Sequence, residues 1–403
     1  MRSVEMFSGA GGLAIGMGNA GFQHEALLEW NKHACNTLRE NKSREFHHAT
    51  HWRVVEGDVR AFDFAKEVTG HINIVAGGPP CQPFSMGGKA QGHMDARDMF
   101  PSAIHAVSEL RPEAFIFENV KGLLRAGFAS YLEYVILRLS YPELVKEEDE
   151  TVEDHLSRLE RAHTGNTYEG LAYRPVFRLL NAADYGVPQK RERVFIIGFR
   201  SDLHEEWSFP KPTHSQDALL WAKWVTGEYW DEHKMARADR PQLDTKMKRR
   251  IDKLKDRYGL LIGPDTLRWR TIRDALVGLP SPVEGEDYWA SHQIMNHEFR
   301  GGAIAYPGHT GSEIDEPSKT IKAGDHGVPG GENMIRFYDG SVRYLTVRES
   351  ARIQTFPDDY FITGSWGEAM RQLGNAVPVL LAQTVAESVR QQLERGHFRM
   401  KVA

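Results

Sequence analysis

The segment Ala76–Ser85 reads AGGPPCQPFS and continues the apolar run Ile72–Ala76. A short apolar run ended by glycine and proline is typical of a buried strand that stops at a turn. The turn carries Cys81, one of only two cysteines in 403 residues. Glycines and prolines before a single thiol predict a fixed bend that presents one side chain at the mouth of a sheet. The alternative is a tight turn with a buried, inert cysteine.

Length and composition set the class of protein. A chain of 403 residues predicts two domains, or one domain with a large insertion. The hydrophobic content of 41% and charged content of 26% are typical of a soluble globular protein. No apolar run approaches the roughly 18 residues of a membrane span. Two cysteines argue against a disulfide framework and fit a reducing cytosol.

Charge is distributed unevenly along the chain. The formal net charge of −5 does not favour a polyanionic partner. However, ten basic residues stand against four acidic ones from Lys234 to Arg257, and eight acidic against two basic from Glu143 to Glu160. A basic run is usually a solvated helix face, so alone it favours nucleic acid only slightly.

Alternating strand and helix patterns predict an α/β fold. We expect helices at Lys32–Glu40, Met99–Leu110, Thr346–Phe356 and Val377–Leu393, and a surface helix in the acidic segment after Tyr141. The expected strands are Arg2–Phe7, Glu25–Leu28, Arg53–Glu56, Ile72–Ala76, Ala114–Phe117, Arg174–Asn181 and Arg193–Phe199. Sheets of this class bind ligands at the carboxyl ends of their strands.

The first strand leads into a glycine turn. Gly9, Gly11 and Ala14 satisfy G-x-G-x-x-G/A, and Glu29 lies 20 residues past Gly9. The glycines let a ligand approach the backbone, and the carboxylate can accept hydrogen bonds from both hydroxyls of a ribose. Dinucleotides, S-adenosylmethionine and plain tight turns all use this pattern. Trp30 is equally suited to stacking on an adenine or to packing.

Polar residues follow the other strands. Asp58 after the third strand suits either an adenine amino group or an ordinary Asx turn. The polar, glycine-containing loop Ser85–Arg97 has the hinges and charges to close over a substrate. Glu118 ends the fifth strand, and Gln189–Arg193 packs three cations into five residues. Alternate strand residues share a face, which puts Arg191 and Arg193 together.

From about Ser201 the periodicity weakens, and few clear helices are expected up to Asp339. We therefore predict a second, smaller, loop-rich domain at residues 201–340. Residues 1–200 and 341–403 form the first domain in this prediction. The cluster His47, His48 and His51 has no cysteine or acidic partners in the pattern, so packing or solvated histidines are favoured over a metal site.

Together these motifs resemble the C5-cytosine DNA methyltransferase family. One departure is Glu5, where the family usually has Asp, and the insertion from Pro142 to about Gly170 is another. The matching segments stand in family order: Glu5–Gly12, Glu29-Trp30, Gly57–Val59, Gly78–Ser85, Glu118–Val120, Gln189–Arg193, Arg343–Pro357 and Gly374–Pro378.

The resemblance implies a doubly wound, Rossmann-like sheet that uses S-adenosylmethionine, with a second domain that recognises the target. It implies catalysis by Cys81 attacking cytosine C6, with Glu118 at N3, Arg193 at O2 and Arg191 as support. The cofactor would lie against Phe7, Gly9, Gly11, Glu29, Trp30, Asp58, Pro80, Asn375 and Val377. Contacts to DNA would come from Ser85, Lys89, Arg97, Thr320, Ile321 and His326.

The implied partner is double-stranded DNA, acted on by a monomer in the bacterial cytoplasm at the nucleoid. The enzyme would pair with a restriction endonuclease, with no metal and no membrane contact. Methylation of cytosine in tRNA is the nearest alternative, and a DNA-binding regulator without turnover is another. NAD in place of S-adenosylmethionine leaves the Pro-Pro-Cys turn and Glu118 unexplained. A thymidylate-type enzyme shares the Pro-Cys nucleophile but not the glycine turn with Glu29.

Overall fold

The computed structural model describes residues 1–80, 98–165, 168–204, 206–259, 262–323 and 330–402. These residues form two compact units. The first comprises Met1–Leu180, Glu192–Pro210 and Ala382–Ala403, and the second comprises Asn181–Arg191 and Lys211–Leu381. Residues 341–381, grouped with the first domain on sequence grounds, therefore fall in the second unit. The functional roles of the two domains stay predictions.

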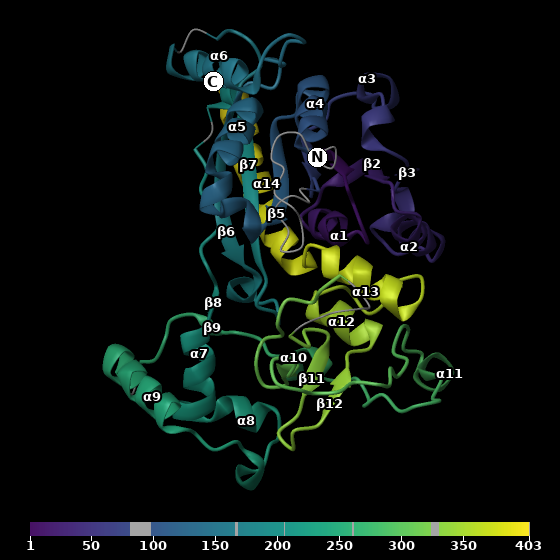
Figure 1. Ribbon diagram of the computed structural model, residues 1–403, viewed down its shortest axis with the longest axis vertical. Coiled ribbons are helices and arrows are strands. Elements are labelled where there is room, and N and C mark those ends of the chain that lie inside the picture. Colours follow the sequence, from purple (N-terminus) through teal and green to yellow (C-terminus); the bar gives the residue numbers. More distant parts are fainter. Residues whose placement is uncertain (81–97, 166–167, 205, 260–261, 324–329, 403) are drawn as a thin grey trace. The chain divides into compact units, whose positions relative to one another are not determined.

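The first unit is built on a seven-stranded sheet of order β3-β2-β1-β4-β5-β7-β6 (Figure 1). Strands β3, β2, β1, β4 and β5 are parallel, and β7 runs antiparallel to β5. The predicted α/β class is confirmed. The strands are β1 (Arg2–Met6), β2 (Gln23–Glu29), β3 (Val54–Glu56), β4 (Ile74–Gly77), β5 (Ala114–Val120), β6 (Tyr173–Asn181) and β7 (Glu192–Arg200).

Helices cover this sheet and share its core. Val75, Phe115 and Phe117 are fully buried with residues of α4 and α5 in one apolar cluster. Arg390 of α14 donates to the carbonyl of Ala20 at the end of α1, 2.7 Å away. The helices are α1 (Gly12–Asn19), α2 (Lys32–Ser43), α3 (Phe64–Glu67), α4 (Phe100–Leu110), α5 (Ala129–Ser140), α6 (Val152–Gly165) and α14 (Val379–Val402).

The second unit is more helical than its weak periodicity predicts. Helices α7 (Gln216–Trp221), α8 (Glu228–Glu232) and α9 (Thr245–Tyr258) fill a segment expected to be irregular. The expectation is wrong there because α9 carries its few apolar residues among many charges. Further helices are α10 (Ile272–Leu276), α11 (Tyr288–His292), α12 (Val347–Ile353) and α13 (Trp366–Asn375).

Short strands complete the second unit. They are β8 (His214–Ser215), β9 (Leu267–Arg268), β10 (Ser312–Glu313), β11 (Met334–Arg336) and β12 (Val342–Tyr344), in a two-stranded and a three-stranded sheet. The stretch between α10 and β10 carries little regular structure, as expected. Among the helices of the described residues, none is long and apolar enough to cross a membrane.

Candidate active site

The candidate site begins at the point where the strand order of the sheet reverses. Strand β1 is followed along the chain by its neighbour β2 on one side, whereas β4 is followed by β5 on the other. Such a switch point opens a crevice at the carboxyl ends of the strands. Met6 and Gly77 are paired there, and a Cβ at Gly77 would overlap the carbonyl oxygen of Met6. Only glycine lets the two strand ends approach so closely.

The glycine turn after β1 is held by Glu29. One carboxylate oxygen accepts the N–H of Gly9 at 2.8 Å, and the other accepts those of Trp30 at 2.9 Å and Asn31 at 2.8 Å. Gly9 and Gly11 have φ of 54° and 85°, the left-handed region that favours glycine, and Phe7 has φ of 57°. The carboxylate thus fixes the turn and still has lone pairs for a ligand.

Among the described residues, none crowds Gly9 of this turn or Gly57 after β3. A Cβ at Gly9 or at Gly57 would meet no described atom within 4 Å. The side chain of Trp30 is 75% exposed, so its indole is free to stack on a planar ring rather than serving as packing. These residues fit the adenosyl part of S-adenosylmethionine.

Asp58 already has a partner within the chain. Its carboxylate accepts the backbone N–H of Arg60 at 2.9 Å, which is an Asx turn, and both oxygens also contact the Arg60 guanidinium. The hydrogen bond from Arg60 lowers the pKa of Asp58. A ligand amino group at Asp58 would share the carboxylate with Arg60.

Glu118 and Arg193 form a buried ion pair at the edge of the sheet. Arg193 Nε lies 2.8 Å from Glu118 Oε1, and their side chains are only 13% and 10% exposed. Val120 is paired with Arg193 across β5 and β7, which brings the guanidinium beside the end of β5. Burial lowers the pKa of Arg193, and the Glu118 carboxylate opposes this effect. A carboxylate and a guanidinium therefore lie together in little water.

The turn after β4 lies against the same strand end. A Cβ at Gly78 would stand 3.2 Å from Glu118 Oε2. Asn119 Nδ2 donates to the carbonyl of Pro79 at 3.0 Å, and the backbone of Met99 donates to the carbonyl of Pro80 at 3.2 Å. Glu118 is thus next to the turn that leads into residue 81.

Arg191, in the second unit, does not contact solvent. Its guanidinium donates to the carbonyls of Ile321 at 3.2 Å, Gly374 at 2.7 Å and Ala376 at 2.8 Å. A Cβ at Gly374 would overlap the backbone of Ala323, so these segments are in close contact. Arg191 therefore links the backbone at Ile321 to the backbone at Gly374–Ala376, and we call this its bracing role. Arg193 pairs with Glu118, whereas Arg191 donates to backbone carbonyls, so the two guanidinium groups have different partners. That their side chains share a face stays a prediction.

The other predicted site residues of the second unit differ in their exposure and contacts. Thr320 Oγ1 donates to the carbonyl of Lys190 at 2.8 Å, and Ile321 is fully buried in an apolar cluster. Asn375 is exposed at the end of α13, and Val377 is buried. Their proposed ligand contacts stay predictions.

The matches to known proteins cover nearly the whole chain. The model of the family described as "C-5 cytosine-specific DNA methylase" matches residues 1–140 and 150–391. The chain belongs to the C-5 cytosine-specific DNA methylase family. It is therefore a DNA cytosine-5-methyltransferase. The family model leaves out residues 141–149, where the acidic insertion begins, and residues 392–403.

Named relatives of this methyltransferase are restriction–modification enzymes. The type II methyltransferase M.PspPI of a Psychrobacter strain is 34% identical over 97% of this chain and 79% of its own length. M.Eco47II of Escherichia coli is 33% identical over 98% of this chain and 80% of its own length, and M.NgoPII of Neisseria gonorrhoeae is 30% identical over 98% and 97%.

Solved structures share the fold of this methyltransferase at low identity. The S. pombe Dnmt2 methyltransferase superposes with a TM-score of 0.52 at 17% identity, covering 98% of this chain and 99% of that one. The Entamoeba histolytica methyltransferase EhMeth gives 0.53 at 13% identity, covering 98% of each. The Rossmann-like methyltransferase sheet expected from the motifs is confirmed.

Two buried glutamines of the methyltransferase, Gln189 and Gln354, form a contact that the sequence did not predict. Gln189 Nε2 lies 3.2 Å from Gln354 Oε1, and Gln189 Oε1 accepts the N–H of Ile321 at 3.2 Å. Gln354 in turn donates to the carbonyl of Leu373 at 2.5 Å. Both stand in motif segments quoted above, but contacts between residues 165 positions apart leave no mark in local spacing.

Five predicted residues lie outside the described part of the chain: Cys81, Ser85, Lys89, Arg97 and His326. Cys35, the other cysteine of the methyltransferase, is a fully buried core residue of α2. Burial, with Glu29 nearby, raises the pKa of its thiol to about 12. Cys35 is therefore unsuited to be a nucleophile.

Proposed function

We propose that this enzyme methylates C5 of one cytosine within a short sequence of double-stranded DNA, with S-adenosylmethionine as methyl donor and Cys81 as nucleophile. The observation that carries the proposal is the buried Glu118–Arg193 pair beside the turn leading into Cys81. A carboxylate and a guanidinium at 2.8 Å can hold N3 and O2, the two adjacent polar atoms on the same edge of a cytosine ring.

The chemistry requires that the ring be activated first. The Cys81 thiolate forms a bond to C6, which makes C5 nucleophilic while Glu118 shares a proton with N3 and Arg193 bonds O2. S-adenosylmethionine supplies the methyl group from a sulfonium. C5 bonds to this methyl carbon, and the electron pair of the broken carbon–sulfur bond stays on the donor sulfur. The C5 proton then passes to water, its electron pair restores the C5–C6 double bond, and the Cys81 thiolate leaves.

We propose that positive charge near the turn favours the thiolate, the reactive form of the Cys81 side chain. A free cysteine has a pKa of about 8.5, so most of it is protonated at neutral pH. Arg193 and the amides of the turn are the groups proposed to lower the pKa of Cys81. They would raise the fraction of thiolate and so the rate of attack on C6.

The residues around the glycine turn are proposed to hold the methyl donor. Glu29 would accept the ribose hydroxyls, Trp30 would stack on the adenine, and Asp58 would meet its amino group. Phe7, Gly9, Gly11, Pro80, Asn375 and Val377 complete the proposed site. Its support is the open space at Gly9 and Gly57 and the exposed indole of Trp30.

A cytosine inside a duplex presents neither face to an enzyme, so we propose that the base is flipped out of the stack. Ser85, Lys89 and Arg97 would hold this state from the DNA backbone, and Thr320, Ile321 and His326 belong to the segment proposed to recognise the sequence. Protection of host DNA against a cognate restriction endonuclease, by a monomer at the nucleoid, is the proposed cellular role. Its support is the family and the type II names of the relatives.

Bisulfite sequencing of DNA from a host expressing the protein tests this function. We expect 5-methylcytosine at one position of one short motif, retained with Cys35→Ser and absent with Cys81→Ser. Unmodified DNA from the folded wild-type protein would contradict the proposal. Methylation confined to tRNA would replace the DNA substrate with the alternative one.

A further inference from the structure

Helix α9 of the second unit has two unlike sides. Its apolar residues Met247, Ile251, Leu254 and Tyr258 recur at helical spacing and pack against Leu220 and Trp221 of α7. Asp244 caps the helix by accepting the N–H of Met247 at 2.6 Å. Packing of its apolar side and the Asp244 cap therefore stabilise helix α9, so the charged residues on its outward side are not needed for this packing.

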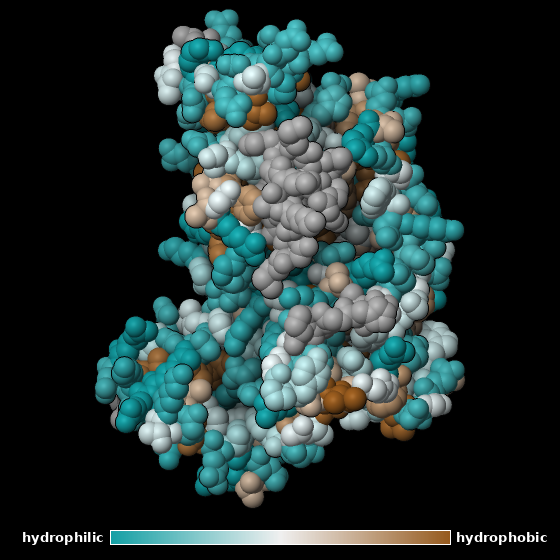
Figure 2. Space-filling model, in the orientation of Figure 1, coloured by the Kyte–Doolittle hydropathy of each residue, from teal (hydrophilic) through white to brown (hydrophobic). Residues whose placement is uncertain are grey.

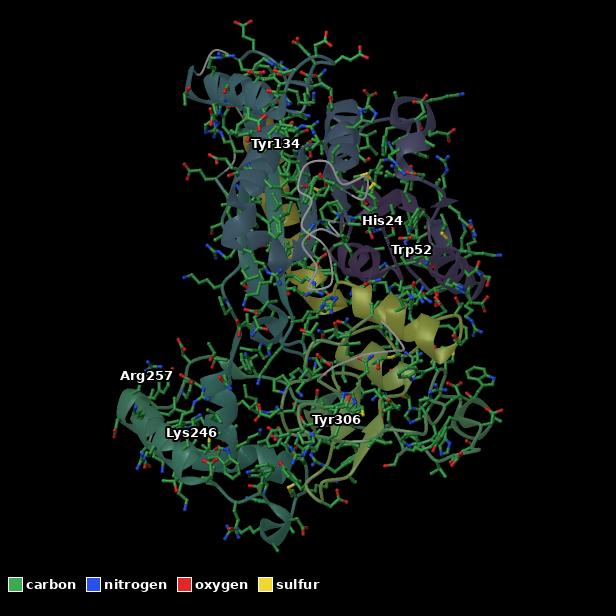
Figure 3. All side chains as sticks on the ribbon, in the orientation of Figure 1. His24, Trp52, Tyr134, Lys246, Arg257 and Tyr306 are labelled. Atoms are coloured by element: carbon green, nitrogen blue, oxygen red, sulfur yellow. The ribbon has the colours of Figure 1, made fainter. Side chains whose placement is uncertain are left out.

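Cations gather along one side of this outward surface. Lys246, Arg249, Lys253 and Arg257 follow one another at intervals of three or four residues, so they form a single stripe along the helix. Lys246, Arg249 and Lys253 are exposed and form no ion pair with any described residue. Arg257 contacts Asp217 at 3.2 Å. In Figure 3, Lys246 and Arg257 mark this helix, and its surface is largely hydrophilic in Figure 2.

The charge of α9 is not that of an ordinary surface helix of this chain. Its 14 residues contain seven cations and two acids, Asp252 and Asp256. Helix α6, also of 14 residues, contains two arginines and three acids, and its Arg158 pairs with Glu150 at 2.8 Å. In a chain of formal net charge −5, the excess of cations in α9 is a local exception, and it favours a polyanionic partner for this helix.

The dimensions of the stripe fit a nucleic acid backbone. Eleven residues separate Lys246 from Arg257, which is about 16 Å along a helix that rises about 1.5 Å per residue. Successive phosphates of a DNA strand advance by about 3.4 Å along the axis, so the stripe spans about five base pairs. A membrane surface is a poorer fit, because the apolar side of α9 that would enter lipid is already buried against α7.

We propose that the stripe Lys246–Arg249–Lys253–Arg257 binds the phosphate backbone of the DNA substrate and supplies affinity without reading its sequence. This inference rests on the proposed function, since it takes duplex DNA as the substrate. Contacts to phosphates release counterions and carry no sequence information. The stripe thus offsets the repulsion between an acidic protein and DNA, whatever motif is methylated.

Two double variants with equal charge change test the stripe. Lys246→Gln/Lys253→Gln removes two cations from it, and Lys248→Gln/Lys255→Gln removes two from the opposite flank of the same helix. Dissociation constants are measured at several salt concentrations from about 50 to about 200 mM, a range over which phosphate contacts change the affinity strongly. The duplexes carry either a site that the wild-type enzyme methylates or a scrambled sequence.

We expect the stripe variant to lower the slope of log affinity against log salt by about 1.8, at about 0.9 for each lost phosphate contact. The loss of affinity should be equal for both duplexes, and the flank variant should stay near the wild type. Equal behaviour of the two variants, or a loss confined to the methylated site, would overturn the proposal. Wild-type protein that methylates no DNA would instead reject the proposed function, and thermal unfolding of both variants checks that they are folded.

Discussion

Arg193 Nε lies 2.8 Å from Glu118 Oε1 within a nearly buried pair at the carboxyl end of β5. Neither charge is well hydrated there, so each depends on the other for compensation. The same two groups are proposed to hold O2 and N3 of the cytosine. The contribution of this ion pair to stability can therefore be measured separately from its contribution to methyl transfer.

Replacing Arg193 alone should be more harmful to stability than replacing both partners. Arg193→Met leaves the Glu118 carboxylate without its cation, which should lower the free energy of unfolding by about 3 kcal/mol. In the double variant Glu118→Gln/Arg193→Met much of this loss should be recovered. Urea denaturation measures both values, and methyl transfer should fall at least about 100-fold in each variant. A double variant less stable than Arg193→Met would show that the pair is not the source of the effect.

Arg191 should act on the structure of the second unit rather than on the substrate. Arg191→Ala leaves the carbonyls of Ile321, Gly374 and Ala376 without this donor, which should cost about 3 kcal/mol of stability. Lys190→Ala is the neighbouring control, since the exposed Lys190–Glu316 contact at 3.6 Å contributes at most about 1 kcal/mol. Thermal unfolding compares them, and an unchanged melting temperature for Arg191→Ala would contradict the bracing role.

Glycines of the sheet edge should differ in their tolerance of a methyl group. Gly77→Ala would force β1 and β4 apart at the carbonyl of Met6 and should destabilise the protein by about 2 kcal/mol. Gly57→Ala meets open space and should change stability by less than about 0.5 kcal/mol. Chemical denaturation provides the comparison. Equal stabilities would mean that the two strand ends are not in close contact.

Glu5 should make stability depend on pH. The Glu5 side chain is fully buried in β1, and its Oε2 lies 4.0 Å from Nε2 of His24. Burial lowers the pKa of His24 to about 4 and so keeps this imidazole neutral. Burial, with Glu29 nearby, also raises the pKa of Glu5 well above its ordinary value. The folded protein thus retains a proton that the unfolded chain releases above about pH 4.5, so this group destabilises the fold progressively as pH rises.

The neutral variant Glu5→Gln removes that dependence. Its stability relative to the wild type should improve between pH 5.5 and 7.5 by up to about 1.4 kcal/mol per pH unit, until the folded pKa is reached. Denaturant titrations at several pH values give this difference. A difference that is constant over the range would show that Glu5 ionises normally in the folded protein.

The sheet and its glycine turn were predictable from the sequence, because buried parallel strands read as short apolar runs that end in turn residues. The hydrogen-bond partners of Glu29 and Asp58 were harder to predict from the sequence. Glu29 accepts backbone N–H groups and Asp58 binds Arg60, and both sets of contacts depend on the geometry of the turns. Helix α9 was not predicted because its four apolar residues, although they stand at helical spacing, are scattered among seven cations and two acids. Packing against α7 and the Asp244 cap stabilise it. The Gln189–Gln354 contact joins residues far apart in the chain, so only the folded structure shows it.

Trapping with 5-fluorocytosine tests the central claim, the bond between the Cys81 sulfur and C6, most directly. A fluorine at C5 cannot leave as a proton does, so the adduct formed after methyl transfer should persist. We predict a DNA–protein adduct that requires S-adenosylmethionine, maps by mass spectrometry to Cys81, survives Cys35→Ser and is lost with Cys81→Ser. No adduct from an enzyme that methylates ordinary DNA, or an adduct at another residue, would contradict the account.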